Sequence, residues 1–286
     1  MSETTLDQML KKWMVAFERY QQADGIITDM DLALYLVYLS VQNCLDVRGD
    51  IAELGVFRGG PFALMTTTLK NDERAHAIDV FDLYFRHPQP ERRFGNDPNV
   101  FKETVQRIAG ADVHYSTVRA DSRIPEEAAR VIHEVGTDCR FFHVDGDHRL
   151  ANIRADIPTA AACVAKNSKP IIVVDDTFAS TMPEVTEGLY EFLRARPDFA
   201  VFLTSVKKTF ICRKNDHDFY AACAIRFFKK ALSKSPERIE VRHVNGDPCV
   251  VLRADGPAEV GDFTLDSVRE LAARTPKLPR VAEDRK

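Results

Sequence analysis

Residues 51–61 read IAELGVFRGGP, a short apolar stretch that runs into a glycine-containing loop and then into a proline. The apolar stretch predicts a buried strand, and Pro61 suits the first turn of a helix. A strand, a tight loop and a helix in this order form the first unit of a parallel sheet. The stretch therefore predicts an α/β fold in which further strand–helix units follow.

The chain after this unit alternates between short apolar runs and amphipathic stretches. We expect strands at 50–54, 75–80, 113–120, 140–144, 170–174, 199–203 and 209–213. We expect helices between them at 61–69, 99–108, 125–135, 149–165 and 183–195. This alternation predicts a doubly wound, mostly parallel, Rossmann-like sheet of about seven strands with helices on both faces.

Two further segments flank the α/β domain, which we place at 49–213. Residues 1–48 predict two helices, the second apolar on most faces, that form a helical cap or dimerisation segment. A helix this apolar is buried against the main body or against a second copy of the chain. Residues 214–286 predict a C-terminal extension with a helix at 220–232, a hairpin around Asn245-Gly246-Asp247, and a loose polar tail.

Composition excludes several classes of protein. The 39 Lys and Arg residues against 43 Asp and Glu residues give a net charge of -4, which argues against a nucleic-acid partner. The six cysteines form no C-x-x-C pair and are typical of buried thiols in a reducing compartment. The start of the chain lacks the pattern of a signal peptide, and the apolar stretch at 32–41 is too short to span a membrane. We expect a cytoplasmic protein without a membrane partner.

Carboxylates follow the predicted parallel strands, one strand after another. They are Glu53, Asp79, Asp121, Asp145, and the pair Asp175-Asp176. In an open parallel sheet, ligands bind at the carboxyl ends of the strands. The sequence therefore predicts an acidic rim around a single binding crevice.

The glycine loop and the acids together indicate a nucleotide-type ligand. Gly55, Gly59 and Gly60 allow close approach of the backbone, although they could simply make a tight turn. Asp79 lies 24 residues after Gly55, where an acceptor for ribose hydroxyls is expected, and Asp121 could accept from an adenine amino group. The carboxylates would repel a pyrophosphate and attract a cationic sulfonium that bears an amino group. This favours S-adenosylmethionine (SAM) over NAD.

A second group of acids suggests a metal ion. Asp145, Asp175 and Asp176 lie at neighbouring strand ends, and unpaired buried carboxylates are costly. Oxygen ligands of this kind suit Mg²⁺, whereas no Cys/His set has the spacing of a zinc site. The alternative is a water-filled acidic crevice.

The loop after the fourth strand carries the candidate bases. Asp147 or His148 could take a proton from a substrate hydroxyl, although His148 could equally make a hydrogen bond at the entry of a helix. His143 lies within the strand and is expected to be structural. The segment 84–99 has no regular pattern and is either an acceptor-binding loop or a surface excursion, with candidate residues Tyr84, Phe85, His87, Arg92, Arg93 and Phe94.

The motifs E-L-G-V-F-R-G-G, A-I-D-V-F-D, R-A-D-S, F-H-V-D-G-D-H and V-V-D-D-T, within residues 49–213, resemble those of a known enzyme family. They are similar to the class I SAM-dependent methyltransferases, and among them to the macrocin-type O-methyltransferases with a D-G-D-H motif. The D-G-D-H turn, Ala155-Asp156 eight residues beyond it and the later pair of aspartates are its most specific part.

The resemblance implies a role for each matching residue. It assigns the cofactor to Glu53, Gly55, Gly59, Asp79, Asp121 and Ser122, and we expect Phe57 and Asp145 in the same cofactor site. It assigns Mg²⁺ to Asp145, Asp175 and Asp176 and the role of general base to Asp147, and His148 stays a candidate catalytic residue beside it. It further implies dimerisation through the N-terminal helices.

The expected function is metal-assisted O-methylation of a small hydroxylated metabolite, of the natural-product or sugar type. Two alternatives stay open at this point. One is an oxidoreductase or hydroxylase-related enzyme on the same fold. The other is a non-catalytic binding or scaffold protein that keeps the crevice.

Overall fold

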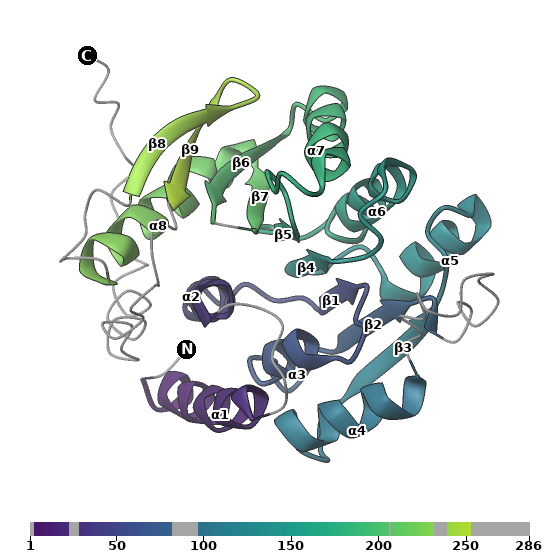
Figure 1. Ribbon diagram of the computed structural model, residues 1–286. Coiled ribbons are helices and arrows are strands. Elements are labelled where there is room, and N and C mark those ends of the chain that lie inside the picture. Colours follow the sequence, from purple (N-terminus) through teal and green to yellow (C-terminus); the bar gives the residue numbers. More distant parts are fainter. Residues whose placement is uncertain (1–2, 23–28, 82–96, 206, 232–238, 253–286) are drawn as a thin grey trace.

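The computed structural model describes residues 3–22, 29–81, 97–205, 207–231 and 239–252 (Figure 1). Its helices are α1 Glu3–Gln21, α2 Asp29–Cys44, α3 Gly60–Thr66, α4 Pro98–Ala109, α5 Pro125–Val135, α6 Leu150–Cys163, α7 Pro183–Ala195 and α8 His217–Ala231. Its strands are β1 Ile51–Leu54, β2 Ala75–Asp79, β3 Tyr115–Arg119, β4 Phe141–Val144, β5 Ile171–Val174, β6 Phe199–Thr204, β7 Thr209–Arg213, β8 Ile239–Val244 and β9 Asp247–Leu252.

The strands form one sheet in the order β3-β2-β1-β4-β5-β7-β6-β9-β8. Strands β3, β2, β1, β4 and β5 run parallel to one another. Strand β7 lies antiparallel to both β5 and β6. The predicted α/β class is confirmed, but the sheet has nine strands rather than seven. The hairpin of β8 and β9 extends the sheet, because β9 pairs in parallel with β6. Without this pairing, β6 would be an exposed edge strand.

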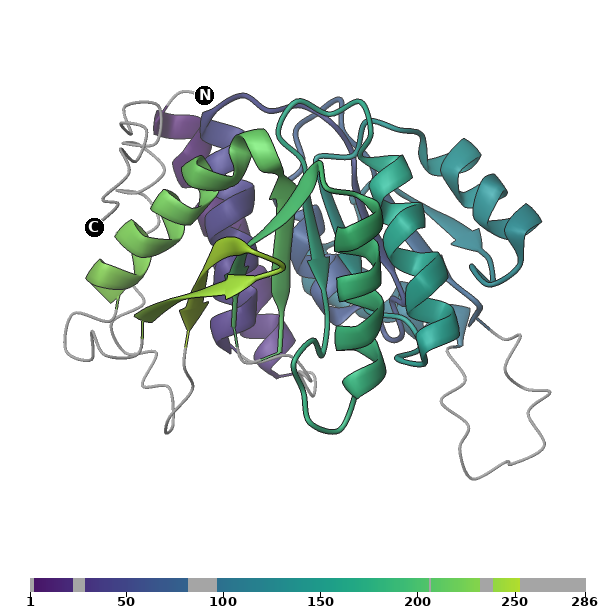
Figure 2. The same cartoon turned by 90° about the horizontal axis from the view of Figure 1, so that it is seen from above.

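Helices cover both faces of the sheet, and each face has its own apolar core. Helices α1 to α4 and α8 pack on one face, and α5 to α7 pack on the other. The alternation of side chains along a strand divides neighbours between the two cores, so Ile51 joins the first and Ala52 the second. Figure 2 shows α8 and the β8–β9 hairpin at one end of the molecule and α5 at the other.

Helix α2 lies against the body of its own chain. The ring of Tyr35 contacts Phe141 of β4 at 5.5 Å and Phe210 of β7 at 6.1 Å between ring centroids. Gln42 donates to the carbonyls of Arg140 and Lys169 at 2.7 and 3.0 Å. Of the two predicted partners for this apolar helix, the structure shows the main body.

The cysteine prediction is confirmed for the thiols themselves. All six are free, five are buried, and Cys44 is half-buried. Within the described ranges, no helix combines the length and apolar character that a membrane span requires.

Candidate functional site

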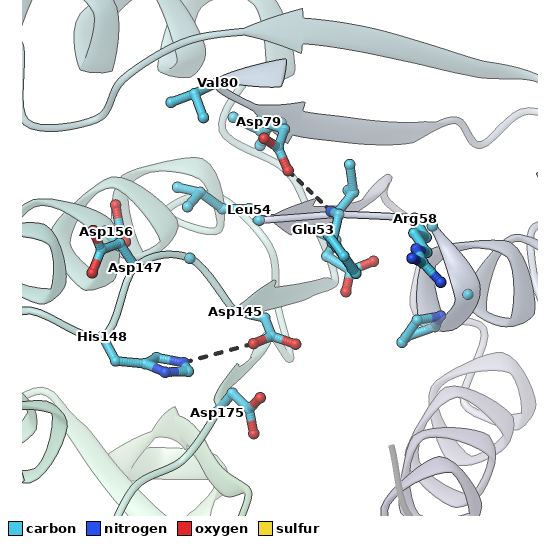
Figure 3. A pocket seen from close by; sticks show the side chains of 18 of the residues that line it. Glu53, Leu54, Arg58, Asp79, Val80, Asp145, Asp147, His148, Asp156 and Asp175 are labelled. Carbon is cyan, nitrogen blue, oxygen red and sulfur yellow. Dashed lines mark hydrogen bonds and ion pairs between the residues drawn. The ribbon is translucent and has the colours of Figure 1, made fainter. Parts of the chain in front are cut away.

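The acids predicted at the strand ends line one cavity of about 1630 Å³. The remaining predicted cofactor, metal and catalytic residues line it too. Figure 3 shows side chains from β1 and β2, and from the segments after β1, β2, β4 and β5, arranged around this space. The candidate acceptor residues at 84–94 lie outside the described residues, so their role in acceptor binding stays a prediction.

Gly55 makes the close approach between the end of β1 and the loop after β4. Its φ of +89° is unfavourable for other residues, and a Cβ at this position would lie 2.1 Å from the carbonyl oxygen of Asp145. Gly59 has a φ of +83° and faces the ring of Phe101. The glycines thus bring the loop backbone, and the start of α3, to the wall of the cavity.

Asp79 ends β2 and is held by the backbone of two loops. Its Oδ2 accepts from the N–H of Phe57 at 3.0 Å, and its Oδ1 accepts from the N–H of Phe81 at 2.9 Å (Figure 3). Asp79 also lines the cavity, so its carboxylate is held in place at the wall where a ligand would bind.

Glu53 belongs to a buried hydrogen-bonded chain under the cavity. Its Oε1 lies 2.7 Å from Nδ1 of His143, whose Nε2 lies 2.8 Å from the hydroxyl of Tyr35 on α2. Among the described residues, its buried Oε2 has no hydrogen-bond partner. Burial, and then the negative charge of Asp145, raise the pKa of Glu53 well above its ordinary value. An unpartnered acceptor of this kind invites a cationic ligand group.

His143 is hydrogen-bonded and structural, as expected. Burial, and then the charge of Lys208, lower its pKa well below the ordinary value, so the ring is neutral. A neutral ring that donates from Nδ1 to Glu53 accepts at Nε2 from Tyr35.

The two predicted cofactor residues that follow β3, Asp121 and Ser122, have different hydrogen-bond partners. Asp121 is paired with the guanidinium of Arg123, and this pair lowers the pKa of Asp121. Ser122 instead donates to Oδ1 of Asp156, a buried residue of α6. The other oxygen of Asp156 has no partner in the described part of the chain and faces Gly146 at the cavity. Asp156 was noted in the sequence only as part of a motif, and the structure adds it to the site.

Asp156 gives the stability of the protein a specific pH dependence. Burial raises the pKa of Asp156 to about 7. The folded state therefore keeps a proton that the unfolded state loses near pH 4, so stability falls as the pH rises from about 4 to 7. In Asp156→Asn this loss disappears.

We expect the gain in unfolding free energy of Asp156→Asn over the natural chain to be small at pH 4, to grow to about pH 7 and then to level off. Urea unfolding of both proteins at several pH values measures it. A difference that stays constant with pH would contradict the raised pKa of Asp156. The control is Asp198→Asn, because Asp198 forms an exposed ion pair with Arg196 away from the cavity.

Asp145, His148 and Asp175 form a cluster at the ends of β4 and β5. Figure 3 shows the three side chains pointing toward one another. Burial alone would raise the pKa of Asp145, but the Lys208 ammonium, together with the neighbouring His148 and Asp175, lowers it to about 2. Burial and the charge of Asp145 raise the pKa of Asp175. The neighbouring Asp145 carboxylate raises the pKa of His148, whose buried Nε2 lies 3.7 Å from Asp145 Oδ1 and has no hydrogen-bond partner among the described residues.

Lys208 is a site residue that the sequence analysis missed. Its side chain is 1% exposed, and Nζ lies 2.6 Å from Asp175 Oδ1 and 3.7 Å from Asp145 Oδ2. Burial lowers its pKa, but Asp145 and Asp175 outweigh burial and raise it. Because β7 runs antiparallel to β5, the residue before β7 lies at the carboxyl edge of the parallel strands. Lys208 directly precedes the apolar stretch at 209–213, and this position is the sequence signal that could have identified it as a site residue.

The predicted Mg²⁺ ligands are brought together only in part. Among the described residues, ligand atoms that lie within 4.8 Å of one another occur in two groups, Glu53 with His143 and Asp145, and Asp145 with His148 and Asp175, and Asp176 belongs to neither. Asp176 has a φ of +48°, and its carboxylate lies 3.6 Å from His148 and 3.7 Å from Lys207. An ion bound 2.0–2.1 Å from Asp175 Oδ1 would lie within about 5 Å of the Lys208 ammonium.

The two candidate bases lie in different surroundings. Asp147 is paired with the guanidinium of Arg149, at 2.7 Å from its Nε. His148 stands among Asp145 and Asp176 and faces the carboxylate cluster. Of the two, His148 is the one placed beside Asp145 and Asp175.

Comparison with solved structures identifies the fold. No family model matches the chain, and no curated protein matches it in sequence. The O-methyltransferase NovP is 14% identical, with a TM-score of 0.52 over 74% of this chain and 99% of that one. An O-methyltransferase from Bacillus cereus in complex with SAH is 12% identical, with a TM-score of 0.48 over 71% and 91%. TomG from Streptomyces achromogenes in complex with SAM is 16% identical, with a TM-score of 0.44 over 72% and 89%. At such identity the likeness to NovP establishes the fold, which is the one that the sequence resemblance implied.

Proposed function

We propose that the chain is a SAM-dependent O-methyltransferase acting on a small hydroxylated molecule. The observation that carries the proposal is the single cavity in which Glu53, Asp79 and Asp145 meet around the Gly55 loop. This lining is anionic and suits a cationic ligand that also has hydroxyl groups. The fold shared with the O-methyltransferase NovP supports it.

The residues of the cavity match the parts of SAM. The unpartnered Oε2 of Glu53 would accept from the amino group, and Asp79 would accept from the ribose hydroxyls. The free oxygen of Asp156, next to Ser122, would lie toward the adenine. NAD fits less well because its pyrophosphate would face these same carboxylates.

The site also supplies what the transfer needs from the protein. Bound SAM would provide a methyl group on a sulfonium for attack by an acceptor oxygen. His148 would take the proton from the acceptor hydroxyl, and Asp145, 3.7 Å from its Nε2, would stabilise the imidazolium that forms. Asp147 is the second candidate for this proton. Holding the acceptor in line is expected to supply much of the rate.

The finer parts of the sequence hypothesis stay predictions. These are an acceptor of the natural-product or sugar type, a dimer through the N-terminal helices, a cytoplasmic location and the absence of a nucleic-acid partner. Participation of Mg²⁺ is disfavoured by the position of Lys208 and needs its own test.

Thermal unfolding with S-adenosylhomocysteine tests the proposed cofactor. At about 100 times its dissociation constant, a ligand stabilises the folded state by about 2.7 kcal/mol. For a chain of 286 residues, that raises Tm by roughly 4–5 °C. We expect this shift with S-adenosylhomocysteine in the presence of EDTA, and none with NAD⁺.

Glu53→Gln should reduce the shift, because the amide can no longer offer two carboxylate oxygens to His143 and to the ligand. A shift with NAD⁺ alone would favour the oxidoreductase alternative. No shift with either ligand would favour the scaffold alternative and overturn the proposal.

A further inference from the structure

Lys208 lies where two possible metal sites meet. In the described part of the chain, ligand atoms that could hold an ion occur in two groups, Glu53 with His143 and Asp145, and Asp145 with His148 and Asp175. The ammonium of Lys208 lies 3.4 Å from Nε2 of His143, a member of the first group, and 2.6 Å from Oδ1 of Asp175, a member of the second. It thus contacts both groups, which share Asp145.

The contacts of this ammonium resemble those of a bound cation. An ammonium has three N–H donors. Around Nζ lie one oxygen of Asp175 at 2.6 Å, one of Asp145 at 3.7 Å, and Nε2 of His143 at 3.4 Å, whose lone pair also faces the hydroxyl of Tyr35. The side chain is almost completely buried, so these groups, rather than water, surround the charge.

The positive charge of Lys208 also offsets the negative charge of the neighbouring carboxylates that suggested a metal site. Asp145 and Asp175 lie side by side at the ends of β4 and β5, and two such carboxylates need a cation to share the site in ionised form. A buried lysine supplies that charge permanently. A divalent ion on the same oxygens would meet the ammonium at close range and be repelled.

We infer that Lys208 is the resident counter-ion of the Asp145–Asp175 pair and takes the place of a divalent metal ion in this site. Lys208 is then a positioning residue that holds both carboxylates, and through His143 also Glu53, in their arrangement. For turnover the inference rests on the proposed function, but its principal test does not.

Binding of Mn²⁺ tests the inference, because Mn²⁺ prefers the same oxygen ligands as Mg²⁺ and free Mn²⁺ is measured directly by electron paramagnetic resonance. The full chain is freed of metal with EDTA, dialysed and titrated with MnCl₂. We expect no binding at the cluster in the natural chain at submillimolar Mn²⁺. Lys208→Met removes the ammonium and leaves Asp145, His148 and Asp175 in place, so we expect it to bind Mn²⁺ at least about 10-fold more tightly. Adding Asp145→Asn to it should abolish the gain.

The matched control is Lys169→Met. Lys169 forms an ion pair with Asp216, and neither residue lines the cavity, so this variant should bind Mn²⁺ as the natural chain does. Lys208→Gln, which keeps hydrogen-bond donors without the charge, replaces Lys208→Met if the latter does not fold, as judged by circular dichroism.

Two results would overturn the inference. One is stoichiometric Mn²⁺ binding by the natural chain that Asp145→Asn removes. The other is a folded Lys208 variant that binds no more Mn²⁺ than the natural chain. Binding of S-adenosylhomocysteine, measured on the same EDTA-treated samples, separates this inference from the proposed function. If the natural chain does not bind S-adenosylhomocysteine, the cofactor assignment is wrong, but the Mn²⁺ result still decides the role of Lys208.

Discussion

Replacing Asp79 with alanine is expected to weaken the binding of S-adenosylhomocysteine by about 100-fold or more. Hydrogen bonds to a charged group contribute about 1.5–3 kcal/mol each, and each 1.4 kcal/mol is a factor of ten in affinity. The variant loses the acceptor proposed for the ribose. It also loses the bonds that fix the backbone at Phe57, after β1, and at Phe81, after β2. Isothermal titration calorimetry measures the change.

Asp121→Ala is the matched control for this variant. Asp121 also follows a strand end and lines the same cavity, but its carboxylate is already bound by Arg123. Exposed ion pairs contribute about 0–1 kcal/mol, so we expect a loss of less than about 5-fold. Equal losses in the two variants would show that strand-end acids act only through their summed charge, contrary to the specific role of Asp79.

Replacing Gly55 with alanine is expected to lower the unfolding free energy by about 3–5 kcal/mol. A left-handed φ of +89° is strained for alanine, and the added Cβ would lie 2.1 Å from the carbonyl oxygen of Asp145 and 2.6 Å from the backbone nitrogen of Gly146. These are backbone atoms, so they cannot rotate away as a flexible side chain does. Urea unfolding measures the loss.

Gly136→Ala separates the two causes. Gly136 has a similar φ of +84°, but a Cβ there meets nothing within 4 Å. With ψ at -167°, this conformation is nearly restricted to glycine, so the substitution carries only the cost of the conformation, about 1–3 kcal/mol. If both variants lose the same amount, the close approach of β1 to the Asp145 loop contributes nothing.

The α/β core could be predicted from the sequence because its strands are short, apolar and separated by helical periodicity. The helices at 125–135 and 183–195 have the predicted bounds, with Pro125 and Pro183 marking their first turns. The place of the β8–β9 hairpin could not be predicted. The hairpin itself is evident around Asn245-Gly246, but its pairing with β6 depends on which sheet edge is open.

The site could be predicted as a set of strand ends, but not as a set of contacts. Parallel strands deliver their following residues to one edge, which is why Glu53, Asp79 and Asp145 meet. Side-chain partners depend on rotamers and on residues far along the chain. Asp121 and Asp147 therefore turned out to be bound by nearby arginines, two residues along in each case. Lys208, which offsets part of the negative charge of the cluster, directly precedes the antiparallel strand β7, which lies outside the repeating pattern.

The position of helix α2 has a consequence for how the protein is made. The helix ends at Cys44, yet the ring of its Tyr35 contacts Phe141 and Phe210, which lie about 100 and about 170 residues after the end of the helix. At roughly 5–20 residues per second, a ribosome needs about ten to thirty seconds to synthesise the strands that cover it. During that time the nascent chain carries an apolar helix without its docking surface. The apolar surface of α2 therefore makes the nascent chain prone to aggregation until these strands have been synthesised.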